Sequence, residues 1–160
     1  MKLVESLRTG FSFGLTSGII TTLGLMVGLQ AGTHSRLAVI GGVLTIAIAD
    51  AFSDALGIHV AEEAEIKHTP AEIWASTLFT FVSKFIVAMS FIVPVLLAPL
   101  EQAVLISVIY GLALLALFSY FLARLEKSAP WHVILEHVFI AAVVIFLAHY
   151  VGDWVRSVFV

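Results

Sequence analysis

The sequence contains no cysteine and few charged residues. With no cysteine among 160 residues, disulfide bonds, thiolate metal sites and redox chemistry at sulfur are excluded. Any metal ion would therefore meet oxygen, imidazole or thioether ligands. Only 12% of the residues are charged, the formal net charge is −3 and no basic cluster is present, so we expect no nucleic acid among the partners.

Signatures of enzymes are missing as well. The sequence has no HExxH, no GxSxG and no glycine-rich loop followed by Gly-Lys. An intramembrane metal enzyme would need a nucleophile or a water-activating motif, and neither is found. We therefore expect a protein that is not an enzyme and has no fixed cofactor.

Apolar residues dominate the chain. They make up 61% of it, and the mean hydropathy of +1.09 lies well above the values of soluble domains. Runs such as AVLISVIYGLALLALF lack the alternating polarity of barrel strands, so the spans are predicted to be helices. The sequence thus predicts an all-α integral membrane protein in contact with lipid.

Five apolar stretches are long enough to cross a bilayer, which takes about 20 residues. The predicted spans are residues 10–31, 37–61, 73–97, 101–123 and 133–152, in a single transmembrane domain over residues 1–160. Pro94 and Pro99 are expected to kink or end the third helix.

Positive charges predict the orientation of these spans. One side of the membrane would hold Lys2, Arg8, Lys67, Arg124 and Lys127, and the other would hold only Arg36 and Arg156. Because Lys and Arg are concentrated in cytoplasmic loops, the amino terminus is expected in the cytosol and the carboxyl terminus outside.

Glycines at a spacing of four form two tracks on the first span. The first track is Gly10, Gly14 and Gly18, and the second is Gly24, Gly28 and Gly32. Glycine at this spacing lets helix backbones approach closely in lipid. The step of six residues between the tracks turns the second by about 240°, so the helix could contact two different neighbours. Packing within one bundle and a dimer seam both remain open.

Ionisable residues interrupt the second span and the loop that follows it. They are Asp50, Asp54, His59, Glu62, Glu63 and Glu65. Asp50 and Asp54 share one helix face, with Asp50 near the midplane, and Glu62 continues the stripe toward the cytosolic mouth. Charged groups inside spans usually face a partner or a water-filled path. We predict that these six residues bind a metal cation along such a path.

Lys84 in the third span is expected at the depth of Asp50. A buried charge is tolerated mainly when it is paired, so the matched depth predicts an Asp50–Lys84 ion pair. In one interpretation the pair only fixes the helix register. In the other, Lys84 occupies an empty cation site, and an incoming cation or proton competes with it for the carboxylate.

Weaker candidates lie elsewhere. Met26 is a packing residue or a soft metal ligand, and Glu136 and His137 are candidates for a metal or proton relay. The pairs His132–Glu136 and His149–Asp153, each at a spacing of four, could share a metal or a proton, or could simply be solvated.

The first two spans, GLTSGIITTLGLMVGLQAG and AIADAFSDALGIHVAEEAE, resemble those of the vacuolar iron transporter (VIT) family. The matching positions are Gly18, Thr21, Thr22, Gly24 and Gly28, then Ser53, Ala55 and Gly57. Three positions depart from the family pattern: Ser17 replaces a membrane-embedded Asp, Asp54 replaces a Met and Ile58 replaces a Glu. The long cytosolic metal-gathering domain of plant-type members shrinks here to EEAEIKHTPAE.

The resemblance implies a five-helix homodimer that exchanges iron(II) or manganese(II) for protons and moves the metal out of the cytosol. We therefore predict a membrane carrier that exports a divalent transition metal. The alternative is a non-transporting membrane scaffold or accessory subunit, in which the acids only pair with Lys84 and the glycine tracks form the interface.

Overall fold

The computed structural model describes residues 2–159, and within that range every regular element is an α-helix. The elements are α1 (Lys2–Thr33), α2 (Arg36–Ala64), α3 (Pro70–Ser90), α4 (Ile92–Leu97), α5 (Leu100–Leu125) and α6 (Pro130–Phe159). Five helical segments are long and apolar enough to cross a membrane, with α3 and α4 together forming the third. The predicted all-α membrane fold is confirmed.

Local sequence signals explain where the helices begin and break. The Ser35 side chain accepts a hydrogen bond from the backbone N–H of Ala38 at the start of α2, and Thr69 and Glu72 form a reciprocal capping box at the start of α3. The third span breaks at Phe91 because Pro94 has no N–H to bond the carbonyl of Ser90. The predicted kink is therefore present, three residues before the proline.

The helices extend beyond the predicted spans. The first begins at Lys2 rather than residue 10, and the last runs from Pro130 to Phe159 rather than over residues 133–152. Hydropathy detects only the part of a helix that lies in hydrocarbon, whereas the backbone hydrogen bonds continue into the polar interface.

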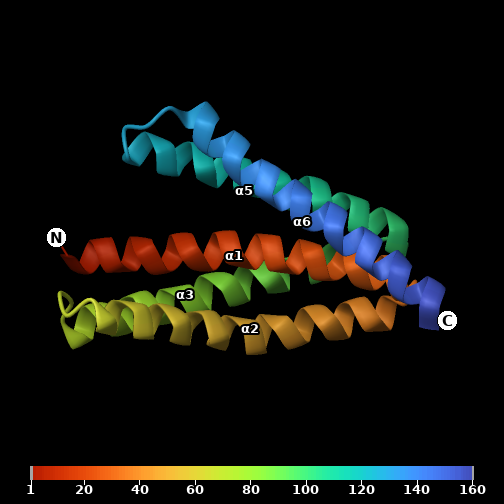
Figure 1. The fold of residues 1–160 in the computed structure, drawn as a ribbon, viewed down its shortest axis with the longest axis horizontal. Coiled ribbons are helices and arrows are strands. Elements are labelled where there is room, and N and C mark those ends of the chain that lie inside the picture. Colours follow the sequence, from red (N-terminus) through yellow and green to blue (C-terminus); the bar gives the residue numbers. More distant parts are fainter. Residues whose placement is uncertain (1, 160) are drawn as a thin grey trace.

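Helix α1 is the centre of the molecule. It contacts α2, α3, α5 and α6, and α1 to α3 run side by side (Figure 1). Helices α5 and α6 form an inclined hairpin that approaches α1 near the carboxyl-terminal end of that helix and diverges from it at the other end (Figure 1). The core includes Ile19, Leu23, Phe91 and Leu115, all fully buried. Large apolar side chains on the outer faces would contact lipid.

The two glycine tracks pack against two different helices of the same chain. A Cβ at Gly10 would overlap the backbone of Ser76 on α3, and Gly14 lies equally close to α3. A Cβ at Gly28 would lie 3.2 Å from the backbone oxygen of Ala148 on α6, and Gly24 and Gly32 also face α6. Each track thus brings α1 into backbone contact with another helix.

Candidate functional site

Lys84 lies at the junction of α1, α2 and α3 and is 1% exposed. Its Nζ atom forms ion pairs with carboxylate oxygens of Asp54 and of Asp50, the latter at 2.6 Å. It also donates a hydrogen bond of 2.9 Å to the hydroxyl of Ser17. The ion pair between Asp50 and Lys84 that matched depth predicts is therefore present, with Asp54 as a second carboxylate partner.

The two aspartates are held differently. The Ser17 hydroxyl donates a hydrogen bond of 2.6 Å to Oδ2 of Asp54, which also binds the ammonium, so this carboxylate is tied to α1 and α3. Oδ2 of Asp50 makes only the ion pair with Lys84, with no directed hydrogen bond from any described residue. Asp50 is therefore the more loosely held carboxylate of the two.

Gly18 allows α1 to approach α3 closely beside Lys84. A Cβ at Gly18 would lie 3.3 Å from the Cα and backbone oxygen of Lys84, so the two backbones are in near contact. Asp50 and Asp54, at a spacing of four on α2, present their carboxylates to the same junction. The site thus rests on rigid helices rather than loops.

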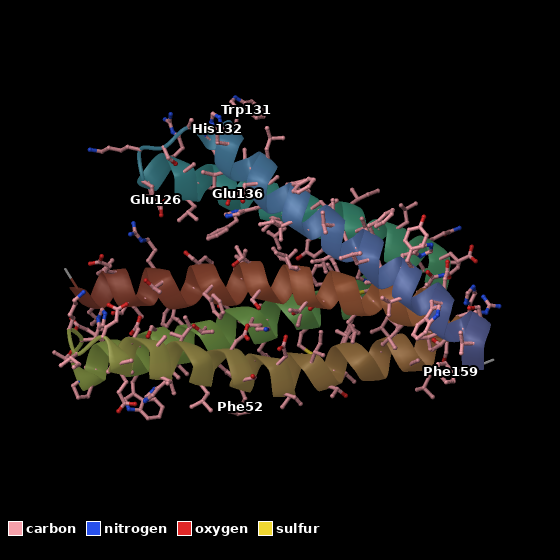
Figure 2. The ribbon with its side chains drawn as sticks, viewed as in Figure 1. Phe52, Glu126, Trp131, His132, Glu136 and Phe159 are labelled. Atoms are coloured by element: carbon pink, nitrogen blue, oxygen red, sulfur yellow. The ribbon has the colours of Figure 1, made fainter. Side chains whose placement is uncertain are left out.

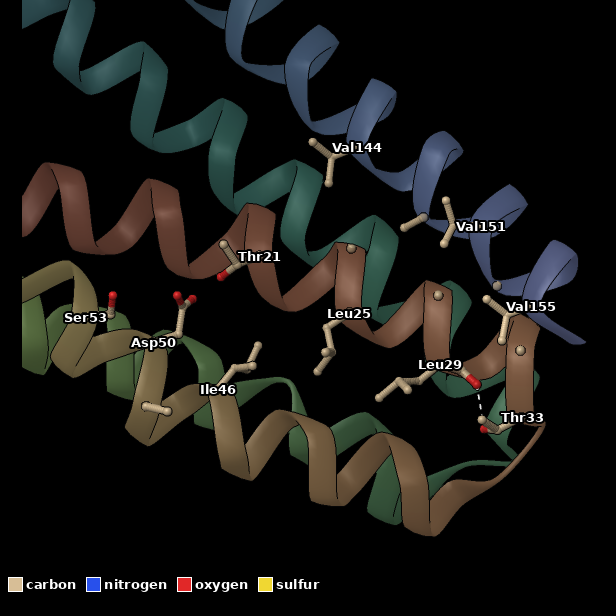
Figure 3. A pocket seen from close by; sticks show the side chains of 16 residues that line it. Thr21, Leu25, Leu29, Thr33, Ile46, Asp50, Ser53, Val144, Val151 and Val155 are labelled. Carbon is tan, nitrogen blue, oxygen red and sulfur yellow. Dashed lines mark hydrogen bonds between the residues drawn. The ribbon is translucent and has the colours of Figure 1, made fainter. Parts of the chain in front are cut away.

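Asp50 also lines an open cleft of about 890 Å³ between α1, α2 and α6. Thr21, Asp50 and Ser53 lie together at one end of the cleft, while Leu25 and Leu29 point from α1 toward α2 (Figure 3). The side chain of Asp50 is 31% exposed and that of Asp54 20%. An ion that enters the cleft would therefore meet Asp50 before Asp54.

A second, more polar cavity of about 470 Å³ lies where the beginning of α1 meets the end of α2. Glu5, Ser6 and Glu62 contribute to its wall, together with Glu65 and His68 from the connection to α3. Glu62 is only 8% exposed, and its Oε2 accepts a hydrogen bond of 2.6 Å from the hydroxyl of Ser76. We call this cavity the vestibule.

The structure separates the other predicted ligands of this region from the vestibule. Glu63 is exposed and lines none of the described cavities that contain Glu62 or Asp50. His59 lies on another face of α2, where its Nδ1 is 2.9 Å from the Thr77 hydroxyl and its ring meets Trp74 edge to face. His59 thus belongs to an apolar groove between α2 and α3.

The weaker candidates also lie away from Lys84. Met26 is fully buried within the hydrophobic core. His137 on α6 lies 2.8 Å from the hydroxyl of Ser119 on α5. Glu136 and His132 lie toward the end of the α5–α6 hairpin that stands apart from α1 (Figure 2). The other predicted pair, His149 and Asp153, has its nitrogen and oxygen 3.4 Å apart on an exposed face.

Within residues 2–159, no group of three or more His, Asp or Glu side chains converges closely enough to hold a metal ion. Five of the six predicted ligands are instead divided among the Lys84 site, the vestibule and the groove beside His59, and the sixth, Glu63, is exposed outside all three. The ammonium group of Lys84 occupies the place between Asp50 and Asp54. Direct coordination of a metal there would require Lys84 to move.

Sequence reasoning did not assign three polar residues to these sites. Ser17 was noted only as a departure from the VIT pattern, yet it bonds both Asp54 and Lys84. Glu5 and Ser6 carry no signal in the sequence, because only the packing of α1 on α2 brings them to Glu62. The one available signal was the position of Ser17, where the family pattern has a carboxylate.

Comparison with known families identifies the family of this chain. The model of the VIT family matches residues 54–153, more than half of the chain. The chain belongs to the VIT family. No curated protein matches it significantly. The VIT match includes both Asp54 and Lys84, whereas α1, with Ser17, lies outside the matched range. VIT membership and the five membrane-spanning helices indicate a multi-pass membrane protein that transports metal ions.

Proposed function

We propose that this VIT-family protein exports iron(II) or manganese(II) from the cytosol in exchange for protons. The observation that carries the proposal is the buried ammonium of Lys84 between Asp50 and Asp54, beside a cleft that reaches the surface. Oxygen ligands suit these metal ions, and two carboxylates on one helix face offer four oxygens.

In the proposed transport cycle, Lys84, the metal ion and protons would compete for the carboxylates of Asp50 and Asp54. In the empty carrier, Lys84 pairs with both aspartates and offsets one of their two negative charges, which keeps the site stable within the bundle. A divalent cation that reaches Asp50 attracts both carboxylates more strongly than a single ammonium does, because its charge is doubled. Protons arriving from the other side would compete for the same oxygens and release the metal. Asp50, which is more loosely held, would make the first contact.

A scaffold without transport activity remains the second candidate. The observation that favours it is the extent to which Lys84 and Asp54 are satisfied by Ser17 and by each other, as in an ion pair that only locks three helices together. In that case the site would bind no cation, and the ion pair would serve only to stabilise the helix bundle.

Flux through proteoliposomes separates these two functions. Purified protein is reconstituted into liposomes loaded with a dye that responds to iron(II) or manganese(II), and a pH gradient is imposed. We expect metal entry in the wild type and its loss in Asp50→Asn and in Asp54→Asn. Glu101→Gln is the control, because this exposed acidic residue at the start of α5 does not line the cleft with Asp50. Absence of flux for every divalent ion tested would reject the carrier.

We also propose that the protein works as a homodimer whose second copy covers the cleft beside Asp50. A partly exposed carboxylate in a mostly apolar cleft is unfavourable if lipid fills that cleft, and a polar surface of a second copy would shield it. The glycine tracks are already used within the chain. In the cysteine-free protein, Ala49→Cys should form a disulfide-linked dimer in membranes, whereas Leu117→Cys, which lies outside this cleft on α5, should stay monomeric.

A further inference from the structure

We propose that the vestibule, where the beginning of α1 meets the end of α2, binds a divalent cation together with part of its water shell. It is a separate site from Lys84. Glu62 lies two helical turns from Asp54, about 12 Å along α2. The role of the vestibule as the entry site for transported metal rests on the proposed function, but binding itself can be measured without transport.

Ser6 provides the first argument. Its side chain is 3% exposed and lines the vestibule, yet its hydroxyl has no hydrogen-bond partner among residues 2–159. Buried hydroxyls are almost always hydrogen-bonded, so an isolated one marks a place that a ligand or its bound water completes. A hydroxyl oxygen can accept a hydrogen bond from a coordinated water molecule or contact the ion itself.

Glu62 provides the second argument. It is nearly buried, and the hydroxyl of Ser76 on α3 holds one of its carboxylate oxygens at 2.6 Å. This contact fixes the carboxylate at the wall of the vestibule and leaves its other oxygen available. A second-shell hydrogen bond of this kind is what orients carboxylates that bind metals.

The charge of the vestibule favours a cation. Glu5 from α1 and Glu65 from the connection that follows α2 join Glu62, while the single basic side chain at the wall is that of Lys67, among the residues described. His68 adds an imidazole whose Nδ1 has no partner in the described chain. Carboxylate and imidazole together suit manganese(II), iron(II) or zinc(II).

The size of the vestibule indicates a hydrated ion. No three of its carboxylate and imidazole groups converge on a common point within the described residues. The volume of about 470 Å³ leaves room for several water molecules, each of which takes about 30 Å³ in the liquid. An ion there would be held by one or two side chains directly and by the others through water. Such a site binds and releases an ion quickly, which suits an entrance.

Binding of Mn²⁺ to purified protein in detergent micelles tests the proposal, because electron paramagnetic resonance reports free Mn²⁺ directly. All measurements use the Asp54→Asn background, so that the Lys84 site contributes less. We expect Glu62→Gln and Glu5→Gln each to raise the Kd about tenfold, since each removes one charged group. The matched control is Glu63→Gln, which removes the same charge from an exposed position outside the vestibule and should change the Kd about twofold or less.

Two results would overturn the proposal. Equal weakening by Glu63→Gln would show only a diffuse surface charge, and loss of all Mn²⁺ binding in Asp54→Asn alone would show that the vestibule holds no ion. Glu5 is exposed, so Glu5→Gln keeps the test valid if Glu62→Gln fails to fold. Failure of the proposed transport is distinguishable, because it would abolish flux in liposomes and leave vestibule binding intact.

Discussion

Lys84 is the central residue of the candidate site. A lysine that is 1% exposed is tolerated because two carboxylates and one hydroxyl meet its ammonium. Breaking a buried pair leaves an uncompensated charge, which is far more destabilising than the intact pair is stabilising. The two carboxylates that stabilise the buried ammonium would therefore also attract any cation that can replace it.

Replacing Lys84 distinguishes competition from a purely structural role. We predict that Lys84→Met lowers the melting temperature in metal-free detergent, by an amount equivalent to about 3 kcal/mol, because Asp50 and Asp54 then repel each other without a counter-ion. Added Mn²⁺ should raise the melting temperature of this variant more than that of the wild type. The melting temperature is measured by heating samples of the protein and using size-exclusion chromatography to determine how much folded protein remains at each temperature.

The control for this prediction is Lys127→Met, which removes an exposed lysine from the α5–α6 connection. It should leave both the melting temperature and the response to Mn²⁺ unchanged. If Lys84→Met unfolds and Mn²⁺ does not rescue it, the lysine is a structural partner only, and the scaffold interpretation is favoured.

At the scale of elements, α1 positions everything else. Its first glycine track contacts α3 and its second contacts α6, so one helix carries the site on one face and supports the cleft on another. Without a hydrophobic driving force between helices in lipid, such close backbone packing is what holds the bundle together. Small changes in the tracks should therefore disturb the site.

Adding one methyl group to the first track tests this argument. We predict that Gly14→Ala destabilises the protein by about 1–3 kcal/mol, because the new Cβ would overlap the Thr80 carbonyl and the Ser83 hydroxyl on α3. Gly41→Ala is the matched control on α2, where a Cβ meets nothing within 4 Å in the described chain. It should be neutral or gain up to about 1 kcal/mol from helix propensity.

Melting temperatures in one detergent check both variants. Equal behaviour of Gly14→Ala and Gly41→Ala would mean that α1 and α3 separate easily, contrary to the packing described.

At the scale of the whole molecule, the distribution of charge along the bundle matters most. The amino terminus, the α2–α3 connection and the α5–α6 connection lie at one end, and the carboxyl terminus lies at the other (Figure 1). Five crossings place the termini on opposite sides of a membrane. Export from the cytosol through the vestibule requires the end that contains Glu62 to face the cytosol, as the excess of Lys and Arg in those connections predicts.

Single cysteines in this cysteine-free chain check the orientation. We predict that an impermeant maleimide labels Ser157→Cys in intact cells, because the end of α6 would face outward and Ser157 is exposed. Ser128→Cys in the exposed α5–α6 connection should be labelled only after the membrane is permeabilised. The reverse pattern would place the vestibule outside and exclude export by the proposed route.

The sequence by itself determined the class of the molecule. Apolar runs of about 20 residues cross a bilayer only as helices, because every backbone N–H and C=O must be bonded within the segment. The depth of Asp50 and Lys84 also followed from the rise per residue, and so did their pairing. The spacing of Gly10, Gly14 and Gly18 predicted close packing, although not which neighbour.

Only the tertiary structure decided which polar groups share a site. Helix periodicity places Asp50 and Asp54 on one face of α2, but the groups opposite them and opposite Glu62 come from other helices. Ser17 meets Asp54, and Glu5 and Ser6 line one cavity with Glu62, because α1 packs against both α2 and α3. His59 was separated from the same stripe because a step of 100° per residue turns it toward Thr77 and Trp74. Spacing along one helix constrains direction, whereas contact between helices depends on packing that no single segment encodes.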